Sequence, residues 1–333
     1  MTIIIQCVLL ILVLNLSTHP KTRTIDCAVR HVGFGAGNSA WVLTRKGEIV
    51  RTTDGGVKWS RPSRGDAARR HVTFVGNRGW AVDDEGHVGI TYDGGQIWQP
   101  LSRFAAERDP DDIGPIITIE FTDELHGWVI DPSSLWRTTD GGETWQERDV
   151  AEQFCFLHFV SRSVGWIGGP TGTIYKTVDG GETWLRKVID QKGAPVRGIS
   201  FAGDRVGWLS THEGIFNTSD GGDSWAKMAI PGTDVVVTSI QFLNEKEGWA
   251  TVVDFKPEAP GRWGFKSMLI HTVDGENWQI ATTINGEEWY QEVHFSDERH
   301  GWLYTGTGLY RTADRGRSWN LVLQYPRANY NID

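Results

Sequence analysis

The sequence predicts an all-β fold, a seven-bladed β-propeller built from four-stranded antiparallel blades. One motif recurs seven times, glycine (40 residues) and tryptophan (17 residues) are abundant, and no helical pattern separates the predicted strands. A single four-stranded sheet with two apolar faces cannot bury both of them. Seven such sheets arranged radially can, so the repeats indicate a closed ring of blades.

Each repeat begins with a strand that ends in phenylalanine and has an aliphatic residue two positions earlier. This spacing places both side chains on one buried face, and we expect this strand to be the innermost of its blade. The phenylalanines are Phe34, Phe74, Phe121, Phe159, Phe201, Phe242 and Phe295.

The second element of each repeat is a small residue followed by tryptophan. Gly precedes every one of these tryptophans except Trp41, which follows Ala40. A short polar turn and a third predicted strand follow. The tryptophans are Trp41, Trp80, Trp128, Trp166, Trp208, Trp249 and Trp302.

The third element is a turn with Thr two residues before an Asp and Trp four or five residues after it, which joins the third strand to the fourth. The aspartates are Asp54, Asp93, Asp140, Asp179, Asp220, Asp274 and Asp314. Such an Asp accepts hydrogen bonds from backbone N–H groups ahead of it, and the glycines supply positive φ. Seven equivalent carboxylates around a rim cannot converge on one substrate, so we interpret them as structural.

The spacing S/T-x-D-x-G-x-T/S-W resembles the BNR/Asp-box repeat. Together with the Gly-Trp and G-x-I/L-Y/F elements, residues 28 to about 324 resemble the photosystem II assembly/stability factor-like family. This resemblance implies a non-catalytic exported propeller without a cofactor that assists the assembly of membrane protein complexes, with a basic surface patch implicated in that role. The alternative is a glycan-binding or sialidase-like glycoside hydrolase propeller.

The chain divides into four predicted segments. Residues 1–19 contain no charged side chain and suit a signal peptide, with an uncleaved anchor as the alternative. Residues 20–27 are expected to be a linker, or a strand that closes the ring. Residues 28–325 form the propeller and 326–333 a tail. We therefore expect a periplasmic or extracellular protein, or one on the lumenal side of a membrane.

The net charge and the positions of the cysteines argue against nucleic-acid binding and against a disulfide. The net charge of −9 argues against a general nucleic-acid binder. We expect a monomer with a protein partner and no transmembrane segment in the mature chain. Cys27 and Cys155 fall in blades 1 and 4, too far apart for a disulfide.

The end of the ring opposite the Asp-boxes is the predicted binding face. Both large insertions fall there, at residues 101–115 and 254–267. Arg30, Arg70 and Arg197 each stand four residues before the phenylalanine of their blade, so they form either an anion clamp or three separate ion pairs. Further candidate binding residues on the second insertion are Arg262, Trp263 and Phe265.

No metal site is expected. Four histidines also lie on innermost strands but belong to four different blades, so we interpret them as core or channel residues: His31, His71, His158 and His294. The acidic run at residues 109–112 offers oxygen ligands for Ca²⁺, but its spacing matches no full loop motif.

Overall fold

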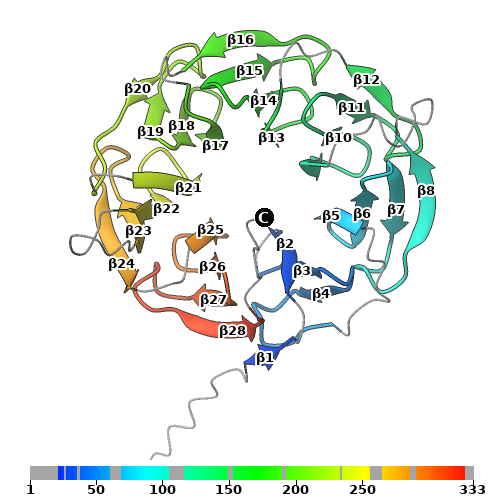
Figure 1. Ribbon diagram of the computed structural model, residues 1–333, viewed down its shortest axis with the longest axis horizontal. Coiled ribbons are helices and arrows are strands. Elements are labelled where there is room, and N and C mark those ends of the chain that lie inside the picture. Colours follow the sequence, from blue (N-terminus) through cyan, green and yellow to red (C-terminus); the bar gives the residue numbers. More distant parts are fainter. Residues whose placement is uncertain are drawn as a thin grey trace, which may run out of the picture.

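The computed structural model describes residues 22–25, 28–35, 38–60, 69–104, 116–148, 153–189, 193–232, 235–255, 265–285 and 290–326. Within these ranges every regular element is a β-strand, and the strands form seven sheets around a common axis (Figure 1). The prediction of an all-β, seven-bladed propeller is confirmed. In the same ranges no helical segment has the length and hydrophobicity that a membrane crossing requires.

The strands of each blade follow one another from the axis to the rim (Figure 1). Blade 1 has β2 (Val29–Phe34), β3 (Ala40–Thr44) and β4 (Ile49–Thr52). Blade 2 has β5 (Arg69–Val75), β6 (Arg78–Asp83), β7 (His87–Thr91) and β8 (Gln99–Arg103). Blade 3 has β9 (Thr118–Phe121), β10 (Gly127–Ile130), β11 (Leu135–Thr138) and β12 (Gln146–Arg148).

The remaining blades repeat this order. Blade 4 has β13 (Phe156–Phe159), β14 (Gly165–Gly168), β15 (Thr173–Thr177) and β16 (Leu185–Val188). Blade 5 has β17 (Val196–Ala202), β18 (Val206–Thr211), β19 (Gly214–Thr218) and β20 (Ala226–Lys227). Blade 6 has β21 (Val235–Phe242), β22 (Gly248–Asp254), β23 (Lys266–Thr272) and β24 (Gln279–Asn285). Blade 7 has β25 (Tyr290–Phe295), β26 (Gly301–Thr305), β27 (Gly308–Thr312) and β28 (Asn320–Gln324).

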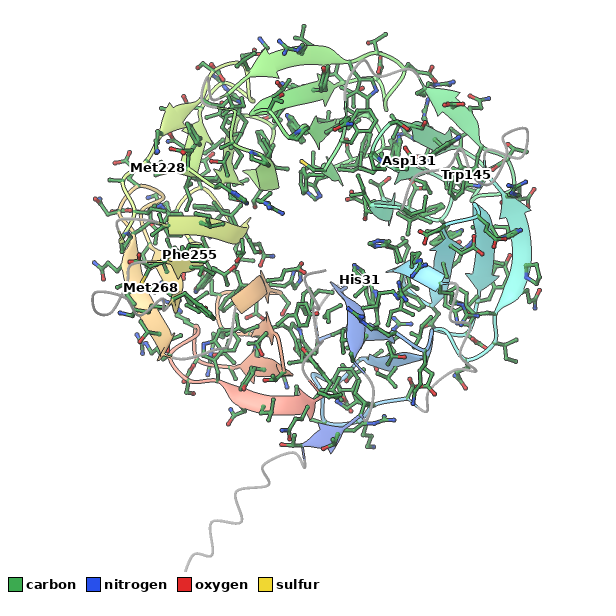
Figure 2. The ribbon with its side chains drawn as sticks, viewed as in Figure 1. His31, Asp131, Trp145, Met228, Phe255 and Met268 are labelled. Atoms are coloured by element: carbon green, nitrogen blue, oxygen red, sulfur yellow. The ribbon has the colours of Figure 1, made fainter. Side chains whose placement is uncertain are left out.

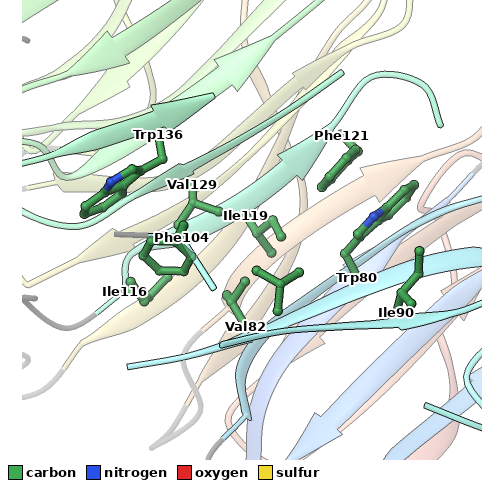
Figure 3. Packing of buried hydrophobic residues seen from close by; sticks show 10 residues of the cluster. Trp80, Val82, Ile90, Phe104, Ile116, Ile119, Phe121, Val129 and Trp136 are labelled. Atoms are coloured by element: carbon green, nitrogen blue, oxygen red, sulfur yellow. The ribbon is translucent and has the colours of Figure 1, made fainter. Parts of the chain in front are cut away.

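Stacked aromatic rings join neighbouring blades. The phenylalanine that ends one innermost strand lies parallel to the tryptophan of the preceding blade, as in Trp80 and Phe121, whose ring centroids are 3.7 Å apart (Figure 3). Trp145 of the Asp-box then packs edge-on against Phe121. The equivalent parallel pairs are Trp128–Phe159, Trp166–Phe201, Trp208–Phe242 and Trp249–Phe295. The phenylalanines and tryptophans that recur in the sequence therefore form the contacts between neighbouring blades.

Each Asp-box is closed by its own side chains. Thr138 Oγ1 donates to Asp140 Oδ1 (2.8 Å) and accepts from Gly142 N (2.9 Å), while Thr144 N and Oγ1 also donate to the Asp140 carboxylate. Burial alone would raise the pKa of Asp140, but the hydrogen bonds from Thr144 and Thr138 outweigh it and hold the pKa below its ordinary value. The same Thr–Asp bond, at 2.7–3.0 Å, occurs in the other six boxes.

Blade 7 closes the ring against blade 1. Arg23–Thr24, within the segment 20–27, form β1, which pairs in parallel with β28 as an additional outermost strand. Ile25 N extends this pairing by donating to Gln324 O (2.9 Å). Arg311 of blade 7 reaches across and donates to Gly55 O (3.2 Å) in the first Asp-box. Part of the expected linker is therefore a closing strand, the alternative for this segment.

Candidate functional site at the channel mouth

The innermost strands begin at the end of the channel opposite the Asp-boxes. Phe121, which ends β9, touches Trp145 of its Asp-box, so the phenylalanine end of an innermost strand lies near the boxes. Arg30, Arg70 and Arg197 lie at the opposite end, near the starts of β2, β5 and β17. We call this end of the channel, defined by these three arginines, the channel mouth.

A β-bulge places the side chains at the mouth. In five blades the register between the first two strands shifts by one residue, always at the fourth position before the phenylalanine. A bulge leaves the extra residue out of the ladder and re-aims its side chain. The extra residues are Arg30, Arg70, Arg197, Thr238 and Gln291. The shared position seen in the sequence is therefore a shared backbone feature.

Arg30 and Arg70 form a positive cluster at this mouth. The pKa of Arg30 is lowered by burial and by the charges of Arg70 and Arg45, with Asp84 opposing them. Arg70 Nε pairs with Asp84 Oδ2, and the Arg70 side chain remains 37% exposed. Arg30 Nε makes no hydrogen bond within the described residues. The guanidinium groups of Arg30 and Arg70 thus lie close enough to repel each other, with the Asp84 carboxylate beside them.

Arg197 is held separately. Its guanidinium contacts Nε2 of His212, with the Nε–Nε2 distance 2.9 Å, and burial together with the Arg197 charge lowers the pKa of His212. Arg197 also opposes the burial that raises the pKa of the Cys155 thiol. The structure therefore brings two of the three arginines together, and gives Arg70 an acidic partner and Arg197 a histidine.

The four channel histidines take part in three separate contacts. His31, at the inner edge of the ring in Figure 2, packs edge-on against His71 with centroids 5.2 Å apart. His158 pairs with Glu120 of blade 3 (3.2 Å), and His294 stacks on Phe34. Within the described part of the chain, no three His, Cys, Asp or Glu side chains are grouped to hold a metal.

A cavity of about 540 Å³ borders the innermost strands of blades 4 to 7. Arg197, His158, Gln241, Glu292 and His294 are among its lining residues. The channel therefore has two chemically different sides. Blades 1 and 2 carry the arginine cluster and two histidines, and blades 4 to 7 line the cavity.

Several predicted site residues lie outside the described part of the chain: Arg262, Trp263, Cys27 and residues 105–115. Phe265 is described and comes just before β23. Cys155 is a free, partly buried thiol. The repeated motif does not single out Asp84, His212 or Glu292, because none of them belongs to it. Aligning the repeats at the phenylalanine would have shown Glu292 at the position that holds His31 in blade 1.

Comparison with known families agrees with the geometry. Residues 109–192 and 149–246 match the family described as photosynthesis system II assembly factor YCF48. This stretch of the chain therefore resembles that family, and the seven-bladed fold agrees with the resemblance. A comparison with curated proteins found no match.

Solved structures of the YCF48 family share the fold. YCF48 from Cyanidioschyzon merolae is 22% identical, with 76% of this chain and 84% of that chain covered and a TM-score of 0.59. A structure described as YCF48 bound to D1 peptide is 18% identical over 86% and 93%, with a TM-score of 0.66. The GH74 xyloglucanase from Xanthomonas campestris is 13% identical over 90% and 54%, also with a TM-score of 0.66. At these identities the likeness concerns the fold.

Proposed function

We propose that this protein is a non-catalytic exported scaffold that binds an acidic segment of a membrane protein complex at the channel mouth. The observation that carries the proposal is the Arg30–Arg70 cluster, in which the two guanidinium groups repel each other beside the Asp84 carboxylate. The match of residues 109–246 to the assembly-factor family supports a role in assembly, and a YCF48 of similar fold is described as bound to a D1 peptide.

The chemistry of the cluster favours a carboxylate-bearing partner. Guanidinium groups bind carboxylates through paired, charge-assisted hydrogen bonds. An incoming carboxylate would relieve the repulsion between Arg30 and Arg70. Because each arginine lies on a bulge of a rigid innermost strand, little conformational freedom is lost on binding.

Capture of membrane complexes tests this function. The exported protein, the Arg30→Ala/Arg70→Ala variant and a control variant Arg299→Ala/Arg315→Ala would be compared as baits. Arg299 and Arg315 lie near the Asp-box of blade 7, where Arg315 pairs with Glu298. We expect the first variant alone to lose the partner. Equal recovery by both variants would refute the arginine site, and retention of the protein in the cytoplasm would refute export.

A glycan-active propeller is the second candidate, motivated by the similarity in fold to the GH74 xyloglucanase. A glycosidase needs two carboxyl groups about 5–10 Å apart across the scissile bond. Of the channel carboxyls described above, Asp84 pairs with Arg70 and Glu120 with His158, which leaves Glu292. Release of reducing sugar from xyloglucan or of sialic acid from a sialoside would establish this candidate in place of the first.

A further inference from the structure

One position of the innermost strand carries a large side chain in some blades and a small one in others. The residue three positions before the phenylalanine is His31 in blade 1, His71 in blade 2 and Phe156 in blade 4, but Gly198 in blade 5 and Ser239 in blade 6. The cavity of about 540 Å³ borders these two small residues. Its volume is typical of a site for a small ligand or a single side chain.

Glu292 occupies the same position in blade 7 and lines this cavity. Within the described residues its carboxyl has no ion pair or hydrogen bond, and its partly buried side chain lies on the wall of the cavity. Burial raises the pKa of Glu292 to about 7, and no neighbouring cation offsets this rise. An ionised carboxylate in such surroundings is costly unless a cation joins it.

The other titratable groups on the cavity wall are already engaged or neutral. On β13, His158 is paired with Glu120, which raises its pKa against the effect of burial. On β17, Arg197 is held by His212. β21 contributes uncharged hydroxyl and amide side chains. On β25, burial lowers the pKa of His294 to about 4, so it is neutral at pH 7.

We propose that this cavity binds the ammonium or guanidinium group of a ligand, with Glu292 as its counter-ion. Ser239 Oγ accepts from Val293 N (3.4 Å) and has a second lone pair for a ligand, and Phe156 is an aromatic residue of the same cavity wall. The ligand is either a free small amine or a lysine or arginine side chain of a polypeptide. This inference does not depend on the partner proposed above, because it concerns different residues and the opposite charge.

Calorimetric titration with two probes tests the site: agmatine, and the blocked tripeptide acetyl-Gly-Lys-Gly-amide. We expect one-to-one binding at pH 8 and affinity about tenfold weaker at pH 6, because Glu292 is protonated below its pKa of about 7. Binding of agmatine alone identifies a site for free amines, and binding of the tripeptide identifies a site for a side chain. The proposal is overturned if neither probe binds saturably.

Two variants and a spectroscopic measurement assign the site to Glu292. Glu292→Gln should lower the affinity about tenfold or more, whereas the control Glu298→Gln near the Asp-box of blade 7 should leave it unchanged. Equal affinities in all three proteins overturn the proposal. Should Glu292→Gln fail to fold, the carboxyl of Glu292 can be followed by ¹³C NMR in the unmodified protein. Its pKa must fall when agmatine is added, and a constant pKa overturns the proposal.

Discussion

At the scale of single residues, Gly127 shows why a glycine precedes the tryptophan in six of the seven repeats. A Cβ at position 127 would lie 2.5 Å from the ring of Phe121, far inside normal contact distance. The phenylalanine cannot move away, because its other side packs against the tryptophan of the preceding blade. The same clash, at 2.4–2.7 Å, occurs at five further glycines: Gly79, Gly165, Gly207, Gly248 and Gly301.

Gly127→Ala should therefore destabilise the protein by about 1–3 kcal/mol, the usual cost of overpacking a filled core. Gly306→Ala is the matched control, since a Cβ there meets nothing within 4 Å. Urea unfolding monitored by tryptophan fluorescence measures both. A loss of stability in the control as large as that in Gly127→Ala would show that the ring of Phe121 is not the cause.

In blade 1, the sequence alone does not determine how the ring of the repeat tryptophan packs. Ala40 stands where the other blades have glycine, an exception visible in the sequence. In the structure the Trp41 ring lies over Gly33 instead, where a Cβ would approach it to 2.3 Å, and Trp41 Nε1 donates to Val72 O. In blade 1 the Trp41 ring therefore requires glycine at position 33 and tolerates alanine at position 40. This difference depends on the orientation of the Trp41 ring, which the repeat pattern does not specify.

At the scale of elements, the repeat predicted the strands but not the contacts of the channel mouth. Aligning the repeats placed Arg30, Arg70 and Arg197 at one position, and the structure shows this position to be a β-bulge in each of their blades. Their partners could not be predicted, because Asp84 and His212 belong to turns between second and third strands whose sequences differ from blade to blade. A repeated motif identifies residues that recur from blade to blade, but not residues that a single blade supplies.

The contact between blades 7 and 1 depends on Arg311, because the aromatic stacking is weaker there. Trp302 and Phe34 are tilted, with centroids 6.3 Å apart, whereas Arg311 donates to Gly55 O and Asn38 Oδ1 across the contact. Arg311→Ala should cost about 1–2 kcal/mol, since it removes two hydrogen bonds to partly buried acceptors. Hydrogen exchange should accelerate in β2 and β28 more than in β13.

Arg299→Ala is the control for this contact, because the Arg299 side chain donates to Ala313 O of its own blade and to no other blade within the described residues. It should leave exchange in β2 unchanged. Uniform acceleration in all blades of Arg311→Ala, or none in β2, would show that this arginine does not hold the ring closed.

At the scale of the whole molecule, stability should fall in acid in two stages. The seven Asp-box carboxyls all have lowered pKa values, about 2 for Asp179, so the stability that they contribute above about pH 4 is lost as the pH falls through those values. Burial lowers the pKa of His31 to about 3, and that of His71 and His294 to about 4.

As the pH falls, the histidines are the first groups to lower the stability. Below about pH 6.5 they are protonated in the unfolded chain, whereas the folded chain keeps them neutral. Two groups with raised pKa values act in the opposite direction: Glu292, between about pH 4.5 and 7, and His158. Four histidines with lowered pKa values, His212 included, outnumber them. Urea unfolding at pH 7, 5 and 3 should give a decreasing free energy of unfolding. An equal free energy of unfolding at pH 3 and at pH 7 would contradict these pKa shifts.

The central claim is that the channel mouth opposite the Asp-boxes binds an acidic polypeptide through Arg30 and Arg70. Its most direct test is the dissociation constant of a tetraglutamate peptide, measured by calorimetry at low ionic strength. Arg30→Ala/Arg70→Ala should weaken binding by about tenfold or more relative to the unmodified protein, and Arg299→Ala/Arg315→Ala should not change it. Equal loss of affinity in the two variants would contradict the claim, because the attraction would then reflect overall charge and not the mouth.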